Sequence, residues 1–548
     1  MTSGTSRPEA PAPLERPEPG APREPVARLE PIASLEPTAP VDQAAPAKPA
    51  APLDQAARME PVARPEPAAR RAASTPSRRT VRIGAGLGFY GDLPFAAAEA
   101  VRAGDIQYLC CDHLAELTMA ILHKDRQRDP RTGYTRDIGL LCQMVLPVAM
   151  ARGVRLISNA GGLNPYGAAR EVLQVAARLG LRDLKVAVVT GDDVLGRLDA
   201  FRQQGAALEP LDGGPSYDEV RHRLLFANAY LGAEPVVRAL ATGAHVVITG
   251  RVADASLFLA PLVYEFGWGW DDWDRLATGV VAGHIGECSA QATGGNFSGR
   301  WWEVPDMDRI GYPVAEVDED GGLVITKPAG TGGLVTPDTV KEQLYYEVHD
   351  PAHYVNPDVV ADFSQIELHP VGPDRVAVTG TRGRPRPETL KVTAGYEDGW
   401  LGQAIIGYSW PDALEKAQAA EQIIRRQMAR AGLNPQEVHV EYLGVNALHG
   451  PLAPIPDEPN EVYLRFVIRT QSREEAERLS RLFPPLALNG PPYIGGALAG
   501  LSRSRQLLGI WSTAVPRAWV EQAVRVEVLG VDDLQGLEQA GLGQQAGS

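Results

Sequence analysis

The chain has 548 residues, with 68 aspartates and glutamates against 53 lysines and arginines, so its formal net charge is −15. This length is more than a single hydrophobic core usually serves, and we therefore expect two or more domains. The acidic balance argues against general binding to nucleic acid or to an anionic membrane surface, because both need a basic face.

Residues 1–79 differ in composition from the rest of the chain. They are rich in proline, alanine and glutamate and contain no aromatic residue. Such a segment cannot bury enough apolar surface to offset its conformational entropy. We therefore expect a disordered tail with polyproline II character, ending in a basic stretch, RRAASTPSRR, that is a solvated linker rather than a docking patch.

Removal of residues 1–75 is expected to leave the melting temperature nearly unchanged, because a segment that buries little surface contributes little to stability. Differential scanning calorimetry of the full and truncated chains measures this. A fall of more than a few degrees would show that the tail packs on the body.

Residues 80–385 are expected to form an α/β domain with a ligand crevice. Its strands are predicted at the apolar runs TVRIGA, IQYLCC, VRLIS, KVAVVT and HVVIT. Runs of this kind, with helix-like stretches between them, are typical of parallel strands that are buried on both faces. Four of the intervening helices are predicted to end at Gly104, Gly153, Gly180 and Gly243. The fold class predicted here is a doubly wound, mainly parallel sheet.

Residues 386–530 are expected to form a smaller α+β domain. Strands are predicted at QAIIGYSW, EVHVEYLGV, EVYLRFVIRT and RQLLGIWSTAV, and helices at PDALEKAQAAEQIIRRQMARAG and SREEAERLSRLF. The second helix has Ser472 as its N-cap and Glu475 at the capping-box position. The order β-α-β-β-α-β is that of ferredoxin-like domains. Residues 531–548 are predicted to be a flexible C-terminal tail.

Six polar, glycine-rich or acidic loops follow the apolar runs of the first domain. Open α/β sheets bind ligands at the carboxyl ends of their strands, so these loops predict one crevice. Candidate substrate-binding residues from these loops and one later loop are Gly86, Gly88, Asn159, Gly161, Gly162, Asn164, Asp193, Arg251, Asp254, Gly294, Gly295, Asn296, Lys327 and Gly332.

Three carboxylates, Asp112, Glu116 and Asp192, are the candidate catalytic residues. Asp112 and Glu116 lie four positions apart at a strand-to-helix junction, where they could ligate a divalent cation or divide acid and base roles. The alternative is a helix cap followed by a first-turn glutamate that complements the helix dipole. Asp192 and Asp193 repeat the pattern, one as an N-cap and the other free for a ligand. We expect Asp112, Glu116 and at least one of Asp192 and Asp254 in one cleft with the 159–164 loop.

The remaining loops each allow a ligand role and a structural role. Backbone N–H groups of the 159–164 loop could bind an oxyanion, or the loop is a plain turn. Arg251 could hold a carboxylate or phosphate, or could pair with Asp254. Lys327 and its glycine loop could hold a phosphate. His284, Glu287 and Cys288 share one helical face or turn but lack a fourth partner for a metal.

The spacing Gly86-x-Gly88-x-x-Gly91 fits the dinucleotide fingerprint, but Asp92 counts against it. A carboxylate at the start of the next helix would compete with a pyrophosphate for the same N–H groups. We therefore expect neither NAD nor flavin; a divalent cation stays open, and the metal ligands are unknown.

The chain is expected to be cytoplasmic. Its N-terminus lacks the apolar segment of a secretory signal, and its apolar runs are far shorter than a bilayer span. The cysteines fit no zinc spacing, and an adjacent pair does not easily form a disulfide with itself, which favours reduced, buried thiols. They are Cys110, Cys111, Cys142 and Cys288.

Read together, several phrases resemble the acyclic terpene utilisation family AtuA. They include IGAGLGFYGD, DIQYLCCDHLAELTMAIL, LISNAGGLNP, VITGRVADASL, ATGGNFSG and ITKPAGTGGLV, and the resemblance spans residues 80 to about 525 in family order. Family members usually carry Asp-Tyr-Leu-Ala-Glu where this chain has Asp112-His113-Leu114-Ala115-Glu116. The departure at His113 leaves both carboxylates in place.

The resemblance implies a pathway in which acyclic terpenoids are degraded as coenzyme A thioesters. It implies this pathway context and not a reaction. We expect an enzyme that acts on an acyl or acyl-CoA substrate, with lyase, hydratase or hydrolase chemistry at the strand-end carboxylates, because such chemistry fits carboxylates without a redox motif. The alternative is a non-catalytic subunit that binds such a ligand and organises partner enzymes. We also expect a homo-oligomer, with no nucleic-acid or membrane partner.

Overall fold

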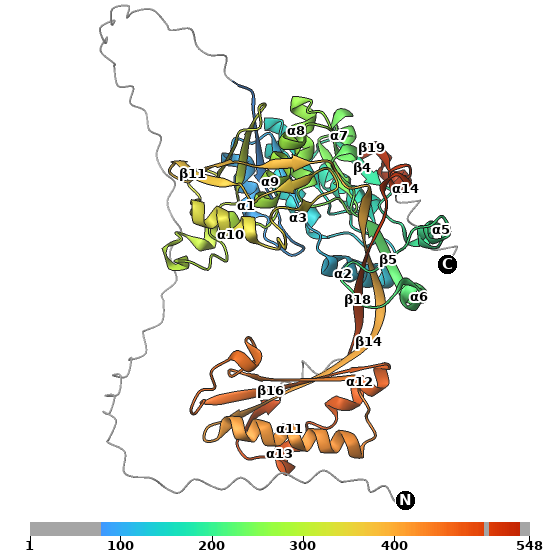
Figure 1. Ribbon diagram of the computed structural model, residues 1–548, viewed down its shortest axis with the longest axis vertical. Helices are drawn as coiled ribbons and strands as arrows, with labels where there is room; N and C mark the ends of the chain where they lie inside the picture. The colour runs from blue at the N-terminus through green and yellow to red at the C-terminus, as the bar shows by residue number, and fades with distance from the viewer. Residues whose placement is uncertain (1–77, 498–503, 538–548) are drawn as a thin grey trace, which may run out of the picture. The chain divides into compact units, whose positions relative to one another are not determined.

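The computed structural model describes residues 78–497 and 504–537 (Figure 1). The predicted N-terminal tail lies almost entirely outside this range. The first residues of the predicted C-terminal tail lie inside it and form a 3-10 turn, Val531–Asp533. There Val531 is buried, and Leu534 and Leu537 pack against the core. These residues are therefore not part of a flexible tail.

The largest sheet has ten strands, and its centre is parallel. The order is β11-β12-β8-β7-β1-β2-β3-β6-β4-β19. The central strands are β1 (Thr80–Ala85), β2 (Tyr108–Cys111), β3 (Arg155–Ser158), β6 (Val246–Thr249) and β4 (Lys185–Thr190). They pair in parallel from β1 to β4, and each lies within or coincides with one of the five predicted runs. The chain is thus a mixed α/β protein.

Antiparallel strands extend this sheet on both sides, so the description "mainly parallel" is wrong for the whole sheet. Next to β1 lie β7 (Val314–Asp318), β8 (Leu323–Thr326), β12 (Arg375–Thr379) and β11 (Glu367–Gly372), and next to β4 lies β19 (Arg525–Gly530). Short turns join β7 to β8 and β11 to β12, and a short turn can connect only antiparallel neighbours.

Helices cover both faces of the parallel strands. Alternate residues of β2 enter two different cores, with Cys110 in one and Leu109 and Cys111 in the other. The first core contains α7 (Glu234–Ala241), α8 (Ser256–Phe266) and α9 (Trp273–Gly286); the second contains α1 (Phe95–Ala103), α3 (Asp137–Arg152) and α4 (Pro165–Arg178). Side chains that alternate across a strand require this double cover when both faces are apolar.

The second sheet is organised by one long strand, β14 (Thr389–Ser409). Its first half pairs with β18 (Arg505–Pro516) and β5 (Leu224–Ala229). Its second half pairs with β16 (Glu461–Thr470) and β17 (Ile494–Ala497) (Figure 1). The predicted strand QAIIGYSW is therefore the second half of β14, and the predicted last strand lies within β18.

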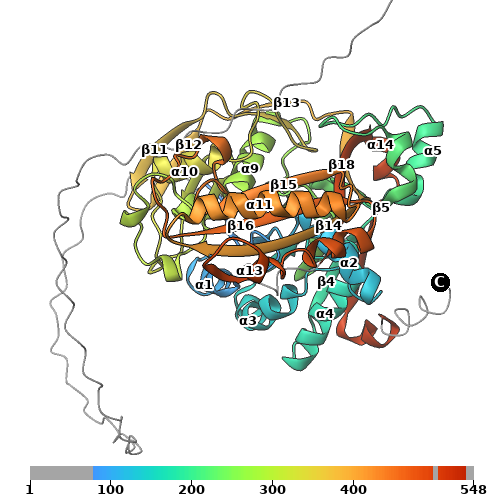
Figure 2. The ribbon, with the colours of Figure 1, turned by 90° about the horizontal axis from the view of Figure 1, so that it is seen from below.

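Beyond β16 lies β15 (Glu437–Leu443), and the order is β15-β16-β14-β17. Helix α11 (Ala413–Arg430) lies across β14, β15 and β16 (Figure 2). Its buried residues share a core with those of α12 (Arg473–Ser480). Because β19 pairs with β4, the range 386–530 contributes to both sheets. The domain boundary at 385/386 stays a prediction.

The remaining elements are a small sheet and several further helices. A three-stranded sheet contains β9 (Tyr354–Val355), β10 (Val360–Asp362) and β13 (Arg382–Arg384). The other helices are α2 (Glu116–Arg128), α5 (Leu198–Gln203), α6 (Tyr217–Val220), α10 (Pro337–Tyr345), α13 (Leu486–Asn489) and α14 (Arg517–Glu521). Within the described ranges, no helix has the length and apolarity needed to cross a membrane.

Candidate functional site

A cavity of about 590 Å³ opens at the carboxyl ends of the parallel strands. Asp112 reaches it from the loop after β2 and Glu116 from the first turn of α2, while Arg251 and Asp254 reach it from the loop after β6. Strands β2 and β6 both pair in parallel with β3, so their carboxyl ends share one edge of the sheet. Four of the sequence-predicted residues therefore face one space.

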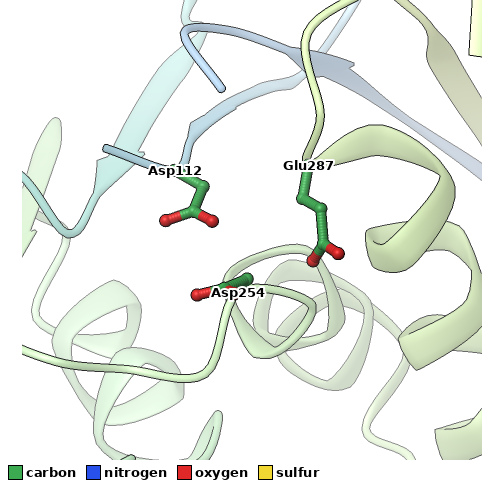
Figure 3. A group of neighbouring side chains, drawn as sticks. All are labelled: Asp112, Asp254 and Glu287. Atoms are coloured by element: carbon green, nitrogen blue, oxygen red, sulfur yellow. The ribbon is translucent and has the colours of Figure 1, made fainter. Parts of the chain in front are cut away.

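Three carboxylates, Asp112, Asp254 and Glu287, line this cavity and are called the acidic trio below. Each offers an oxygen that lies within 4.8 Å of those of the other two. Figure 3 shows their side chains turned toward one another from three separate segments: the end of β2, the loop before α8 and the end of α9.

Burial and mutual repulsion disfavour the charged forms of the acidic trio. Burial raises the pKa of Asp112 well above its usual value, Asp254 raises it further, and Arg251 opposes them. Burial likewise raises the pKa of Asp254 and, together with Asp254, that of Glu287. Like charges gathered in a poorly hydrated site must bind protons or a cation. Three carboxylates make an oxygen-rich ligand set that could hold a hard divalent cation.

Arg251 is the buried cation of the site. Its Nη1 donates to the carbonyl of Leu114 at 2.5 Å, and its Nη2 to Asp254 Oδ1 at 2.6 Å. Its guanidinium carbon lies 4.1 Å from the centre of the Tyr230 ring. Burial opposes the charge, but Asp254, Tyr230 and Asp112 raise the pKa of Arg251 above its ordinary value. The arginine therefore stays charged and pairs with Asp254.

Glu116 lies on the cavity wall with Tyr230 and Lys391. The Tyr230 hydroxyl donates to Glu116 Oε1 at 2.5 Å, and Lys391 Nζ lies 3.2 Å from the same oxygen. Burial alone would raise the pKa of Glu116, but Tyr230, Arg251 and Lys391 together lower it to about 2. Burial raises the pKa of Tyr230, so its hydroxyl keeps its proton. Glu116 is thus ionised at neutral pH.

The 159–164 loop meets the site at one residue only. Asn159 accepts from the backbone N–H of His113 at 2.7 Å and donates to Asp112 Oδ1, so it orients that carboxylate. Asn164 caps α4 by accepting from Gly167 N at 2.9 Å. Gly161 packs against Thr249, and Gly162 takes a positive φ of 48°. None of the loop's predicted residues is in the cavity lining, and its oxyanion role stays a prediction.

Asp192 does not line the cavity but contacts the backbone of Arg251, which does. It accepts from Asn228 Nδ2 and from the backbone N–H of Arg251, both at 2.8 Å. Burial raises its pKa to about 6, and these hydrogen bonds oppose the rise. Asp193 accepts from Leu195 N at 3.1 Å and closes a turn. The contacts of Asp192 fix the loop that carries Arg251.

The predicted glycine loops divide into two groups. Gly88, Gly295 and Asn296 line the cavity, whereas Gly86, Gly294, Lys327 and Gly332 do not. Lys327 donates to the carbonyl of Thr331 at 2.8 Å and lies 3.3 Å from Asp374. An ion pair of this kind leaves the lysine engaged within its own loop.

The sequence analysis did not predict Tyr230 or Lys391 as site residues. It grouped Glu287 with His284 and Cys288 as possible metal ligands and not with Asp112 and Asp254. Tyr230 follows β5, which was not predicted as a strand, and Lys391 lies inside β14, where nothing in the sequence marks a ligand site. In the structure, His284 Nδ1 lies 3.0 Å from Glu287 Oε1, and burial lowers the pKa of His284 to about 4. The neutral histidine orients the glutamate and does not join the acidic trio.

Comparison with protein families confirms the resemblance. The family described as acyclic terpene utilisation family protein AtuA matches residues 81–526, which is most of the chain, so the chain belongs to this family. Comparisons with curated proteins and with solved structures found no match.

Proposed function

We propose that this member of the AtuA family is an enzyme of acyl or acyl-CoA metabolism that acts on a terpenoid or related branched carboxylate. Its chemistry is that of a lyase, hydratase or hydrolase. The main support for this proposal is that one cavity is lined by two carboxylates, two cationic side chains and a tyrosine hydroxyl. These residues are Asp112, Glu116, Arg251, Lys391 and Tyr230. Small-molecule sites typically combine a cavity of this size with a few convergent polar groups.

Glu116 is the general base of the proposed reaction. It is ionised at neutral pH and held in one orientation by Tyr230. The side chain of Lys391 is 42% exposed, so it can turn from Glu116 to an anionic or carbonyl oxygen of the substrate. Loss of that positive neighbour raises the basicity of Glu116 at the moment when a proton must be taken up.

The acyl chain lies against the apolar part of the same wall. The apolar lining residues are Phe89, Leu114, Ala115 and Tyr346, and Phe89 is exposed. Transfer of a branched hydrocarbon chain from water to such a wall is favourable in proportion to the area buried. The cavity thus offers charged groups for the reacting end and an apolar surface for the chain.

Incubation with a panel of branched and linear acyl-CoA thioesters and free acids, followed by mass spectrometry of the products, tests the proposal. Glu116→Gln is expected to lower turnover about 10²–10⁴-fold, the usual loss of a general base. The control is Glu415→Gln, an exposed glutamate in the first turn of α11. Equal turnover in Glu116→Gln and wild type would overturn the assignment of Glu116. Binding of a thioester without turnover would favour the ligand-binding scaffold instead.

The pH dependence gives a second test. Because the pKa of Glu116 is lowered to about 2, its base form is retained down to about pH 3 and is lost only below that. Activity is therefore expected to show no loss from this group between pH 8 and 5. Lys391→Met removes a positive neighbour, so the acid limb should move to higher pH. Profiles of kcat/KM for both proteins measure the shift, and an acid limb unmoved by Lys391→Met would contradict the pairing.

We also propose, as the finer fold, a doubly wound domain followed by a ferredoxin-like one. The helices on both faces of the parallel strands support the first part. The antiparallel order β15-β16-β14-β17, with α11 and α12 in one core, supports the second.

A further inference from the structure

We propose that the acidic trio binds one divalent cation of the hard, oxygen-preferring class that includes Mg²⁺, Mn²⁺ and Ca²⁺. The three side chains come from separate segments, yet their oxygens gather within 4.8 Å (Figure 3). This assignment goes beyond the proposed function, which needs only proton transfer by Glu116.

An unpartnered oxygen points independently to a ligand. Glu287 is only 8% exposed, and its Oε2 is buried without a hydrogen-bond partner among the described residues. A buried carboxylate oxygen normally accepts a hydrogen bond, because leaving it bare forfeits its hydration. A cation bound between Glu287, Asp112 and Asp254 would satisfy it.

Each carboxylate of the acidic trio has one oxygen held by the protein. Asp112 Oδ1 accepts from Asn159 and from Leu114 N, Asp254 Oδ1 from Arg251, and Glu287 Oε1 lies beside His284 Nδ1. Asp112 and Asp254 also lie within hydrogen-bonding reach of each other, so that they could share a proton that a cation would replace. Glu287 Oε2 has no partner among the described residues. Outer hydrogen bonds that fix one carboxylate oxygen and leave the other free are typical of metal sites.

The charge of the cavity favours a cation as well. Its lining has five carboxyl groups and two cationic side chains, Arg251 and Lys391, so acidic groups exceed basic groups by three. Arg251 is already paired with Asp254, and Lys391 lies beside Glu116. The lining carboxylates are Asp112, Glu116, Asp254, Glu287 and Glu347.

A cation there would leave coordination positions open. Mg²⁺ and Mn²⁺ take about six oxygen ligands, so three carboxylates leave room for water or for an oxygen of the substrate. Bound in this way, the ion would polarise a carbonyl or carboxylate oxygen in the cavity.

The test uses the full chain, stripped with EDTA and titrated with MnCl₂ and MgCl₂ by isothermal calorimetry without substrate. Wild type is expected to bind about one ion per chain and to gain melting temperature with it. Glu287→Gln keeps the shape of the side chain and is expected to weaken binding about 10–100-fold. Because it removes one of three repelling charges, the apo protein should remain folded. Asp254→Asn is the second variant and should weaken binding to a similar extent.

The matched control is Glu347→Gln, which removes one charge from the same cavity outside the acidic trio. Its affinity for the ion is expected to stay within about threefold of wild type, since Glu347 is not one of the three carboxylates whose oxygens gather within 4.8 Å and would not ligate the ion. An equal loss in Glu347→Gln and Glu287→Gln would overturn the site in favour of diffuse attraction. Absence of binding by wild type at millimolar metal would also overturn it. Neither result bears on the proposed role of Glu116, because that role is tested by the turnover of Glu116→Gln.

Discussion

Replacement of Arg251 by methionine is expected to lower the free energy of unfolding by about 3–5 kcal/mol, the usual cost of removing one partner of a buried charged pair. The Arg251 side chain is 3% exposed and is the cation nearest to Asp254, with which it shares a 2.6 Å contact. Methionine keeps part of the packing on Tyr230 but leaves the carboxylate uncompensated. Urea denaturation in EDTA, followed by circular dichroism, measures the change.

The control for this prediction is Arg238→Met on α7. Arg238 also pairs with a glutamate, Glu234 at 3.0 Å, but about half of each side chain is exposed. Exposed pairs of this kind contribute about 0–1 kcal/mol. If Arg251→Met costs no more than Arg238→Met, the buried arginine does not compensate the carboxylates of the cavity.

Gly88→Ala is expected to lower turnover about 10²-fold, because the added methyl group would displace the 287–290 turn, which lines the cavity that holds the substrate. A Cβ at Gly88 would lie 2.6 Å from the carbonyl oxygen of Glu287 and would also overlap the backbone nitrogen of Ser289. Backbone atoms cannot rotate away, so the turn must shift, at a cost of about 1–3 kcal/mol in stability. Turnover and the urea midpoint are measured on the same preparation.

Gly196→Ala is the matched control, since a Cβ at Gly196 meets nothing within 4 Å. It should leave both turnover and the urea midpoint close to wild type. Unchanged turnover in Gly88→Ala would mean that this wall of the cavity tolerates displacement without affecting the reaction.

The sequence predicted the central strands well and the outer ones poorly. TVRIGA and KVAVVT coincide with β1 and β4, because a strand buried on both faces must be apolar at nearly every position. LLFANA and RVEVLG were missed. The second of these, β19, lies at an edge of the large sheet, and most of its residues are exposed or half-buried. Its sequence therefore lacks the continuous apolar run that marks a buried strand.

The position of several site residues followed from the strand pattern alone. Asp112 and Glu116 follow β2, and Arg251 and Asp254 follow β6. Carboxyl ends of parallel strands meet at one edge, so the sequence could predict that these side chains share a space. Their catalytic role stays a prediction. The same reasoning also placed Asp192 among the candidates for this cleft. Asp192 is absent from the cavity lining, and its Oδ2 accepts from both Asn228 Nδ2 and Arg251 N.

The sequence by itself determined the family, the parallel centre of the sheet and the edge at which the cavity opens, because strand burial and loop composition are local properties. Only the tertiary structure decided which groups complete that cavity. Glu287 arrives from the end of α9, Tyr230 from beyond β5 and Lys391 from β14, which pairs with β5. Those contacts depend on packing between separate elements, in one case between Lys391 and Glu116, which lie 275 residues apart, and the pattern within any one segment does not predict them.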